Sequence, residues 1–160
     1  MSEITLTNDE KARYARHLIL PQVGELGQKK IKSASVLVVG AGGLGSPVLL
    51  YLAAAGIGRI GIIDDDNVDM TNLQRQIIHS TSSVGELKVE SAKRRINQIN
   101  PEVIIEIFGE RLNIKNAEKI IDKFDIVVDG TDNFSTRYTI SDCCETVSYT
   151  HLTLPTIYSV

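Results

Sequence analysis

A glycine-rich turn and a run of aspartates carry the first chemical signal in the sequence. Gly40, Gly42 and Gly45 fit the pattern G-x-G-x-x-G, after a short apolar run and before a Leu- and Ala-rich segment. Such glycines let a turn tighten and approach a phosphate, while the next helix offers free N–H groups and a positive dipole end. Asp64 lies about 20 positions further on, where an acidic side chain can hydrogen-bond a ribose hydroxyl. The pattern predicts a nucleotide site, with a ligand-free glycine turn as the structural alternative.

The glycine pattern alone does not distinguish a dinucleotide from ATP, but three charged residues further along the chain do. Arg75, Lys88 and Asp132 all lie in loops or at helix starts near the carboxyl ends of expected strands, where a doubly wound sheet binds its ligand. A dehydrogenase needs no such cations around the phosphates. Phosphoryl or nucleotidyl transfer does, because fixed cations and a metal must stabilise the charge that develops on the phosphate. The set therefore favours ATP.

Each of these residues also has a simpler interpretation. Arg75 or Lys88 taken singly would be a solvated surface charge, and Asp65 and Asp66 could cap the loop after their strand or support a metal ion. Other polar residues are interpreted as packing, hydrogen-bonding or surface groups: His17, His79, Asp129, Cys143 and the run 93–95. Only the position of Arg75 and Lys88 among the other motifs favours a functional role.

The elements that must position these groups follow a β-α-β-α-β-α-β order. Four nearly continuous apolar runs are typical of strands buried on both faces of a parallel sheet: 35–40, 59–64, 103–108 and 125–129. Helices are expected between and before them: 7–18 with a capping box, 25–33, 44–55, 85–100 and 117–124. The expected fold is α/β, with a doubly wound, Rossmann-like, mostly parallel sheet and an N-terminal helical extension.

Composition limits the class of protein. The chain has 160 residues, of which 42% are hydrophobic, and a formal net charge of −3. One core, a cytoplasmic location and no nucleic-acid or membrane partner are expected, because the N-terminus is no leader peptide and the apolar stretch 47–57 is too short to span a bilayer. The adjacent cysteines, Cys143 and Cys144, have neither a disulfide framework nor the C-x-x-C spacing of a zinc site.

Five segments, in the same order and at the same spacing, carry a resemblance up to about residue 142. They are Arg13-Tyr14-Ala15-Arg16-His17, the turn 40–45, Asn72-Leu73-Gln74-Arg75-Gln76, the segment 85–88, and Thr131-Asp132-Asn133. With these segments, the chain resembles the ThiF/MoeB/HesA family, the bacterial relatives of ubiquitin-activating enzymes. The resemblance implies ATP-dependent adenylation of the C-terminal glycine carboxylate of a ubiquitin-like sulfur-carrier protein, with release of pyrophosphate, in thiamine or molybdopterin biosynthesis.

The resemblance also implies roles for individual residues. ATP and Mg²⁺ are the implied cofactors, and the partner would end in Gly-Gly. The implied catalytic residues are Arg16, Arg75, Lys88 and Asp132, and Asp132 would also bind the metal. The implied nucleotide contacts are Gly40, Gly42, Gly43, Gly45, Asp64, Asp66, Thr71, Asn72, Leu73, Gln74, Arg75, Lys88, Asp132 and Asn133. Since the second arginine of the first motif reaches the ATP of the other subunit in the family, Arg16 implies a homodimer.

The resemblance ends near Cys144. The expected division is a helical extension at 1–34, a Rossmann-like nucleotide domain at 35–146 that is incomplete at its C-terminal end, and a non-native tail at 147–160 from a frameshift, truncation or vector. Carrier docking and any C-x-x-C zinc site would lie in sequence that this chain lacks. Alternatives are an NAD(P)-binding oxidoreductase, an adenylating tRNA-modifying relative, and a non-catalytic fragment that keeps only the fold.

Overall fold

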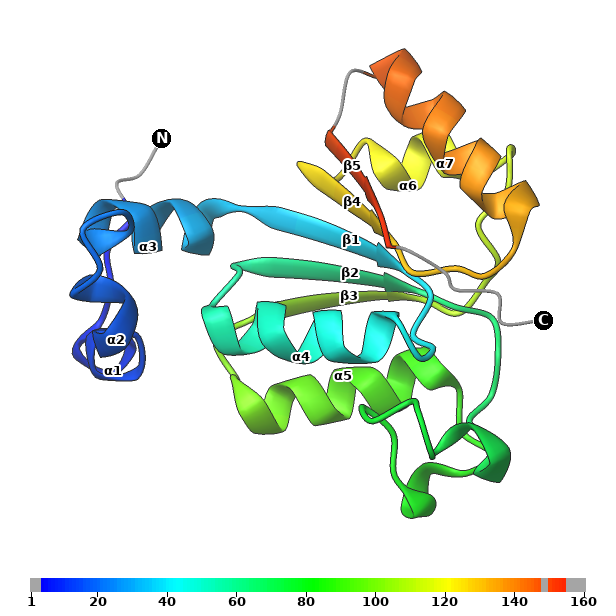
Figure 1. Ribbon diagram of the computed structural model, residues 1–160, viewed down its shortest axis with the longest axis horizontal. Helices are drawn as coiled ribbons and strands as arrows, with labels where there is room; N and C mark the ends of the chain where they lie inside the picture. Colours follow the sequence, from blue (N-terminus) through cyan, green and yellow to red (C-terminus); the bar gives the residue numbers. More distant parts are fainter. Residues whose placement is uncertain (1–3, 148–149, 155–160) are drawn as a thin grey trace.

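The centre of the protein is one parallel sheet, seen in the computed structural model with strand order β3-β2-β1-β4-β5 (Figure 1). The structure describes residues 4–147 and 150–154. The strands are β1 (Ser35–Val39), β2 (Arg59–Ile63), β3 (Ile104–Phe108), β4 (Ile126–Asp129) and β5 (Thr150–Thr153). From β1 the chain adds β2 and then β3 on one side of the sheet, and it then adds β4 and β5 on the other side. The expected α/β doubly wound sheet is confirmed, and its switch point lies between β1 and β4.

Helices cover both faces of the sheet, which is why the central strands are apolar along their whole length. On β1, Val36 and Val38 belong to the core that α4 (Gly45–Ala55) and α5 (Lys88–Ile99) cover (Figure 1). Leu37 and Val39 point to the other face, where α6 (Ala117–Ile121) and α7 (Phe134–Val147) pack. Successive side chains of a strand alternate between faces, so β1, β2 and β4 contribute to two cores, one on each face, where the sequence predicted one.

The crossover from β2 to α5 is the least regular part of the domain. It contains two short 3₁₀ helices, η1 (Met70–Asn72) and η2 (Thr81–Ser83). The expected helix start at Gly85 is too early, because Gly85 has a φ of 90° and donates its N–H to the carbonyl of Val68. Lys88 is consequently the first residue of α5.

Three helices precede the sheet: α1 (Asn8–Arg13), α2 (Ala15–Leu18) and α3 (Gly24–Ser33). The capping box at Thr7 and Glu10 is confirmed, since each accepts a hydrogen bond from the backbone N–H of the other. The single helix expected to run to Leu18 is instead two short helices that meet at Tyr14. The extension lies at the amino ends of the strands, beside the start of β1 (Figure 1).

A buried amide joins this extension to the domain. Asn100 is fully buried, and its Nδ2 donates to the hydroxyl of Tyr14 and to the carbonyl of Ala53, at 2.8 Å each. Replacing Asn100 with alanine should lower the free energy of unfolding by about 2 kcal/mol, because two buried acceptors lose their donor. Tyr14→Phe should cost about half as much, since Asn100 keeps its bond to Ala53. Urea denaturation of both variants measures the difference, and equal losses would contradict this assignment.

The fifth strand was not predicted, and the expectation of four strands is wrong. Thr150–Thr153 pairs in parallel with β4, in the register Val128↔Leu152. Three of its four residues are threonine or histidine, so it lacks the continuous apolar run by which the other four strands were found, including β3 at the opposite edge. The expected non-native tail at 147–160 includes these residues, while 148–149 and 155–160 lie outside the described residues. Its origin stays a prediction.

Among residues 4–147 and 150–154, none of the helices combines the length and the apolar character required to cross a membrane.

Candidate functional site

A cavity of about 610 Å³ opens at the carboxyl ends of the strands, beside the glycine turn. It lies at the switch point between β1 and β4, where open α/β sheets bind their ligands. Residues that the sequence predicted as site residues line much of it: Gly40, Gly42, Gly43, Asp64, Asp66, Arg75, Lys88, Asp132 and Asn133. The fold therefore brings together residues that are more than 90 positions apart along the chain, such as Gly40 and Asn133.

The glycine turn is packed tightly against the loop after β4. Gly40 has a φ of 94°, and a Cβ there would lie 3.2 Å from the carbonyl oxygen of Gly130. Gly45 has no room for a side chain, since a Cβ would lie 1.9 Å from the carbonyl oxygen of Gly40. Unlike Gly40, Gly45 does not line the cavity. Close packing between the turn and the start of α4 therefore explains why residue 45 is a glycine. A direct contact between Gly45 and a ligand stays a prediction.

Asp64 connects the end of β2 to this turn. Its carboxylate accepts hydrogen bonds from the N–H of Ala41, at 2.8 Å, and from the N–H of Asp66, at 2.9 Å. Burial raises the pKa of the Asp64 carboxyl above its usual value, while these two N–H donors act in the opposite direction. Asp64 also lines the cavity, so the predicted ribose acceptor is held by the same turn that would bind phosphate.

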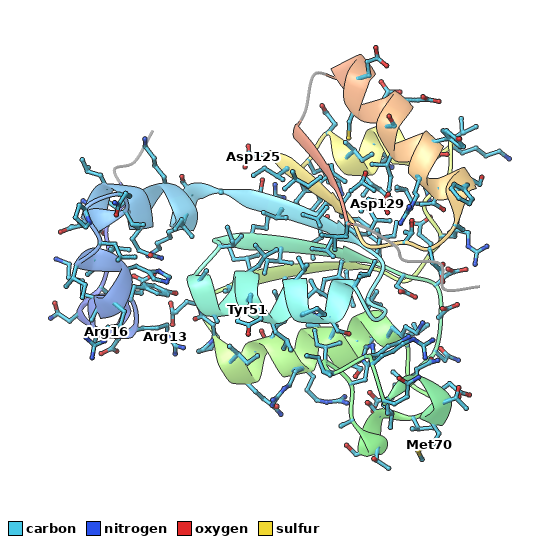
Figure 2. The ribbon with its side chains drawn as sticks, in the orientation of Figure 1. Arg13, Arg16, Tyr51, Met70, Asp125 and Asp129 are labelled. Carbon is cyan, nitrogen blue, oxygen red and sulfur yellow. The ribbon has the colours of Figure 1, made fainter. Side chains whose placement is uncertain are left out.

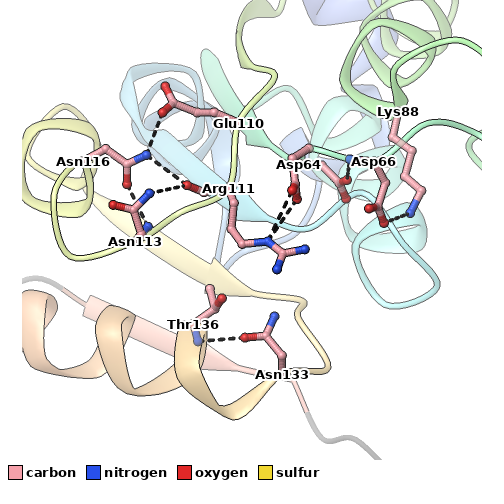
Figure 3. Close-up of polar contacts among 10 residues, drawn as sticks. Asp64, Asp66, Lys88, Glu110, Arg111, Asn113, Asn116, Asn133 and Thr136 are labelled. Carbon is pink, nitrogen blue, oxygen red and sulfur yellow. Dashed lines mark hydrogen bonds and ion pairs between the residues drawn. The ribbon is translucent and has the colours of Figure 1, made fainter.

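Lys88 is a buried cation at the start of α5. Its ammonium lies 2.6 Å from a carboxylate oxygen of Asp66, and its side chain is only 6% exposed (Figure 3). The backbone repeats the contact, because the N–H of Lys88 donates to the carbonyl of Asp66. A cation held out of water acts more strongly on a nearby phosphate than a solvated one. The interpretation of Lys88 as a solvated surface charge is therefore wrong.

Arg75 and Arg111 add two exposed guanidinium groups to the cavity wall. The stem of Arg75 lies along the glycine turn, since a Cβ on Gly43 would be 3.5 Å from Cγ and Cδ of Arg75. Arg111, which follows β3, forms an ion pair of 3.3 Å with Asp65. The sequence predicted Arg75 but missed Arg111 and its neighbour Glu110. The signal that could have identified them is their position just after a strand, at the carboxyl ends of the strands where the other site residues lie.

Asp132 and Asn133 lie in the loop between β4 and α7. The side chain of Asn133 accepts the N–H of Thr136 at 2.8 Å and so caps α7 (Figure 3). Asp132 is exposed and lines the cavity. Asp64, Asp65 and Asp66 also line it, and one carboxylate oxygen from each of these three lies within 4.8 Å of the others. Oxygen donors of this kind fit Mg²⁺, which takes one or two carboxylates and the oxygens of a bound phosphate.

Besides Gly45, five predicted residues do not line this cavity. Thr71, Asn72, Leu73 and Gln74 occupy η1 and the turn after it, and Thr71 is bonded to the carboxylate of Asp69. Arg16 lies on α2 at the far end of the molecule from Asp129, which ends β4 (Figure 2). Within one chain, Arg16 does not approach the cavity. The roles of these five residues stay predictions.

The two cysteines are not part of the site. Burial raises the pKa of Cys144 to about 11 and also raises that of Cys143, so both stay protonated thiols at neutral pH. Both lie on α7, and Cys144 belongs to the core between that helix and the sheet.

His79 lies behind the glycine turn, as the packing and hydrogen-bonding residue that the sequence predicted. Its Nε2 is 2.9 Å from the carbonyl oxygen of Ala41, and its Nδ1 is 2.9 Å from the hydroxyl of Ser91. Burial lowers the pKa of the His79 ring below its ordinary value of 6.5, and the nearby charge of Lys88 lowers it further, against the effect of the Ala41 bond. The ring is therefore neutral at pH 7.

This lowered pKa predicts a contribution to the pH dependence of stability. Between the folded pKa and the unfolded value of about 6.5, the unfolded chain binds more protons, so stability falls as the pH drops below 6.5. Replacing His79 with glutamine removes the titrating ring and should flatten that part of the profile. Denaturation at pH 7.5, 6.5 and 5.5 would measure it. Parallel profiles for the two proteins would contradict the lowered pKa.

A protein-family model described as the ThiF family matches residues 14–156. The probable molybdopterin-synthase adenylyltransferase of Porphyra purpurea is 51% identical over 148 residues, which cover 92% of this chain and 39% of that protein. The probable adenylyltransferase/sulfurtransferase MoeZ of Mycobacterium tuberculosis (strain H37Rv) is 53% identical over 137 residues, or 86% of this chain and 35% of that protein. This chain therefore spans about 35% to 39% of the length of these relatives.

Solved structures show the same fold with nucleotides bound. One is the E. coli tRNA N6-threonylcarbamoyladenosine dehydratase TcdA in complex with ATP, which superposes with a TM-score of 0.88 at 29% sequence identity. The aligned region covers 94% of this chain and 61% of the TcdA chain. E. coli MccB, solved with AMPCPP and MccA, has a TM-score of 0.77 at 30% identity, with 96% of this chain and 46% of its own covered.

Proposed function

The chain belongs to the ThiF family, and from that premise we propose that it forms the ATP-binding part of an enzyme that adenylates a protein carboxylate. The substrate would be the C-terminal glycine of a ubiquitin-like sulfur-carrier protein. One observation supports this proposal above the others. A single cavity at the switch point gathers the glycine turn, an acid for the ribose, a buried lysine and an exposed aspartate.

Binding of ATP would use both sides of the cavity. The turn around Gly42 would contact the phosphates through backbone N–H groups, and the carboxylate of Asp64 would accept a ribose hydroxyl. Because Asp64 and the turn are already joined by a hydrogen bond, the two halves of the nucleotide would meet a site held in one geometry. ATP binding by TcdA, a neighbour in fold, supports the same use here.

The reaction would join the carrier carboxylate to the α-phosphorus of ATP. A carboxylate oxygen forms the new bond to phosphorus, the bond from that phosphorus to the bridging oxygen breaks, and pyrophosphate leaves with the bonding electrons. The carboxylate is already ionised at pH 7, so no general base is required. Catalysis then rests on positioning the two reactants and on neutralising negative charge.

Lys88 and Arg75 would supply the fixed positive charge for this step. Lys88 is desolvated and held by Asp66, so its ammonium is already in place before the charge develops. Asp132 would hold Mg²⁺, which when bound neutralises charge on the phosphates. Arg16, at the other end of its own chain, would act at the cavity of a second subunit, which requires a homodimer.

The choice of partner rests on the relatives. Those at 51% to 53% identity are named as a molybdopterin-synthase adenylyltransferase and an adenylyltransferase/sulfurtransferase, whereas the tRNA-modifying TcdA is 29% identical. These identities favour a sulfur carrier over a tRNA. A nicotinamide oxidoreductase is disfavoured, because hydride transfer has no use for the cations at Lys88 and Arg75.

Exchange of labelled pyrophosphate into ATP tests the proposal. The enzyme of which this chain would form the ATP-binding part is mixed with MgATP and a carrier that ends in Gly-Gly, with the same carrier lacking its last two glycines as a control. Exchange that depends on the intact terminus is expected. Nicotinamide dinucleotide binding without any exchange would overturn the proposal in favour of an oxidoreductase.

A further inference from the structure

Hydrogen bonds link four residues in series, from α5 through His79 to the nucleotide cavity. The hydroxyl of Ser91 on α5 meets Nδ1 of His79, and Nε2 of His79 meets the carbonyl of Ala41. On the other side, the N–H of Ala41 donates to Asp64 at 2.8 Å. Ser91, His79 and Ala41 are buried, so water does not compete for these bonds.

Hydrogen-bonding chemistry fixes the form of the His79 ring. A carbonyl oxygen only accepts, so Nε2 must carry the proton that reaches Ala41. In the neutral ring, Nδ1 is then an acceptor, and the hydroxyl of Ser91 donates to it. The carbonyl of Ala41 thus sets the tautomer, and the hydroxyl of Ser91, which can donate or accept, adapts to it and bonds Nδ1.

The bond from His79 also fixes the next N–H group. The carbonyl of Ala41 and the N–H of Gly42 belong to one planar trans peptide, so they point in opposite directions. Because the carbonyl is held toward buried His79, the N–H of Gly42 is directed away from it. Gly42 lines the cavity, and a Cβ there would meet only the side-chain nitrogen of Gln76 within 4 Å.

The same crossover segment follows the turn residue by residue. Arg75 lies along Gly43, Gln76 approaches Gly42, and His79 binds Ala41. The carbonyl of Gln76 also accepts the N–H of His79 at 3.1 Å, which ties the two contacts into one unit. The segment 75–79 therefore contacts three consecutive residues of the turn.

We infer that His79 is a positioning residue for nucleotide binding, which orients the N–H of Gly42 toward a phosphate by holding the carbonyl of Ala41. This inference rests on the proposed function for the identity of the ligand. His79 lies outside the cavity wall, so it would affect the nucleotide through the peptide plane between Ala41 and Gly42 and not by touching the ligand. Ser91 acts one step further back, by holding the ring through its hydrogen bond to Nδ1.

Two variants of His79 separate the positioning role from simple packing. Glutamine places an amide nitrogen near the position of Nε2 and keeps a donor for Ala41, whereas asparagine reaches only the position of Nδ1 and keeps only the Ser91 partner. His79→Asn should bind ATP about tenfold more weakly than His79→Gln, the equivalent of one lost hydrogen bond. Calorimetric titration of each folded variant with MgATP measures this, with thermal unfolding to give the folded fraction.

Equal ATP affinity of the folded His79→Asn and His79→Gln variants would overturn the inference, whatever their stabilities. Nuclear magnetic resonance of the nucleotide-free chain gives a second readout that does not depend on the proposed function. The His79 ring should show a proton on Nε2, and the amide signal of Gly42 should move in His79→Asn but little in His79→Gln. A proton on Nδ1 alone, or an unmoved Gly42 signal, would also overturn it. If these signals behave as expected while the wild-type chain binds no ATP, the proposed function fails and the orientation of the turn stands.

Discussion

Replacing Lys88 with methionine should lower the rate of ATP–pyrophosphate exchange by about 10²- to 10³-fold, the usual cost of removing one preorganised charge-stabilising group. The ammonium of Lys88 lies in the cavity wall, 2.6 Å from Asp66, with 6% of the side chain exposed. Methionine keeps an unbranched side chain, one atom shorter, and removes the ammonium group together with its hydrogen bond to Asp66. The carboxylate left behind on Asp66 is 57% exposed and is hydrated by solvent, so the variant should stay folded.

Lys93→Met is the matched control, because Lys93 lies on the same helix, outside the cavity. The exchange rate of Lys93→Met should stay within twofold of that of the unchanged protein, because salt screens the effect of a charge that lies outside the cavity. Asp66→Asn separates charge from position: the ammonium remains but loses its ionic partner, so a smaller loss is expected. Similar rates for Lys88→Met and Lys93→Met would remove Lys88 from the mechanism.

The parts of the fold that sequence predicted are those with strong local signals. Four strands were found because each is a nearly continuous apolar run, such as Ser35–Val39, which is buried along its whole length. The cap at Thr7 was found because its two hydrogen bonds lie within one turn. The edge strand Thr150–Thr153 carried no such signal. The break at Tyr14 was missed because no local pattern marks it, while the Tyr14 hydroxyl is held by Asn100, far along the chain.

In the candidate site, residue types were predictable and partners were not. Asp64 was found by its distance from the glycines, and Arg75 and Lys88 by the motifs around them. The pairing of Lys88 with Asp66 depends on the path of the crossover between β2 and α5, which no local pattern encodes. The same is true of Arg111, which approaches the cavity only because β3 lies next to β2.

Gly45 offers the second large effect, on stability rather than on chemistry. A Cβ on this residue would lie 1.9 Å from the carbonyl oxygen of Gly40 and 2.9 Å from its carbon, both backbone atoms that cannot rotate away. The turn cannot yield easily, because Gly40 itself is packed on Gly130 with a φ of 94°. Gly45→Ala should therefore lower the free energy of unfolding by about 3 kcal/mol or more, at the upper end of the cost of overpacking.

Gly42→Ala is the matched change three residues earlier in the same turn. A Cβ on Gly42 would meet only the side-chain nitrogen of Gln76, at 3.7 Å, an ordinary contact. Its unfolding free energy should stay within about 1 kcal/mol of the unchanged protein, while ATP affinity falls, because the new methyl group occupies the side from which a phosphate approaches. Urea denaturation and titration with MgATP, performed on both variants, test the pair. If Gly42→Ala were the less stable variant, or if Gly45→Ala unfolded like the unchanged protein, the close packing assigned to the turn would be wrong. The expected result is lower stability for Gly45→Ala and lower ATP affinity for Gly42→Ala. It would show that Gly45 is required for packing of the turn and Gly42 for nucleotide binding.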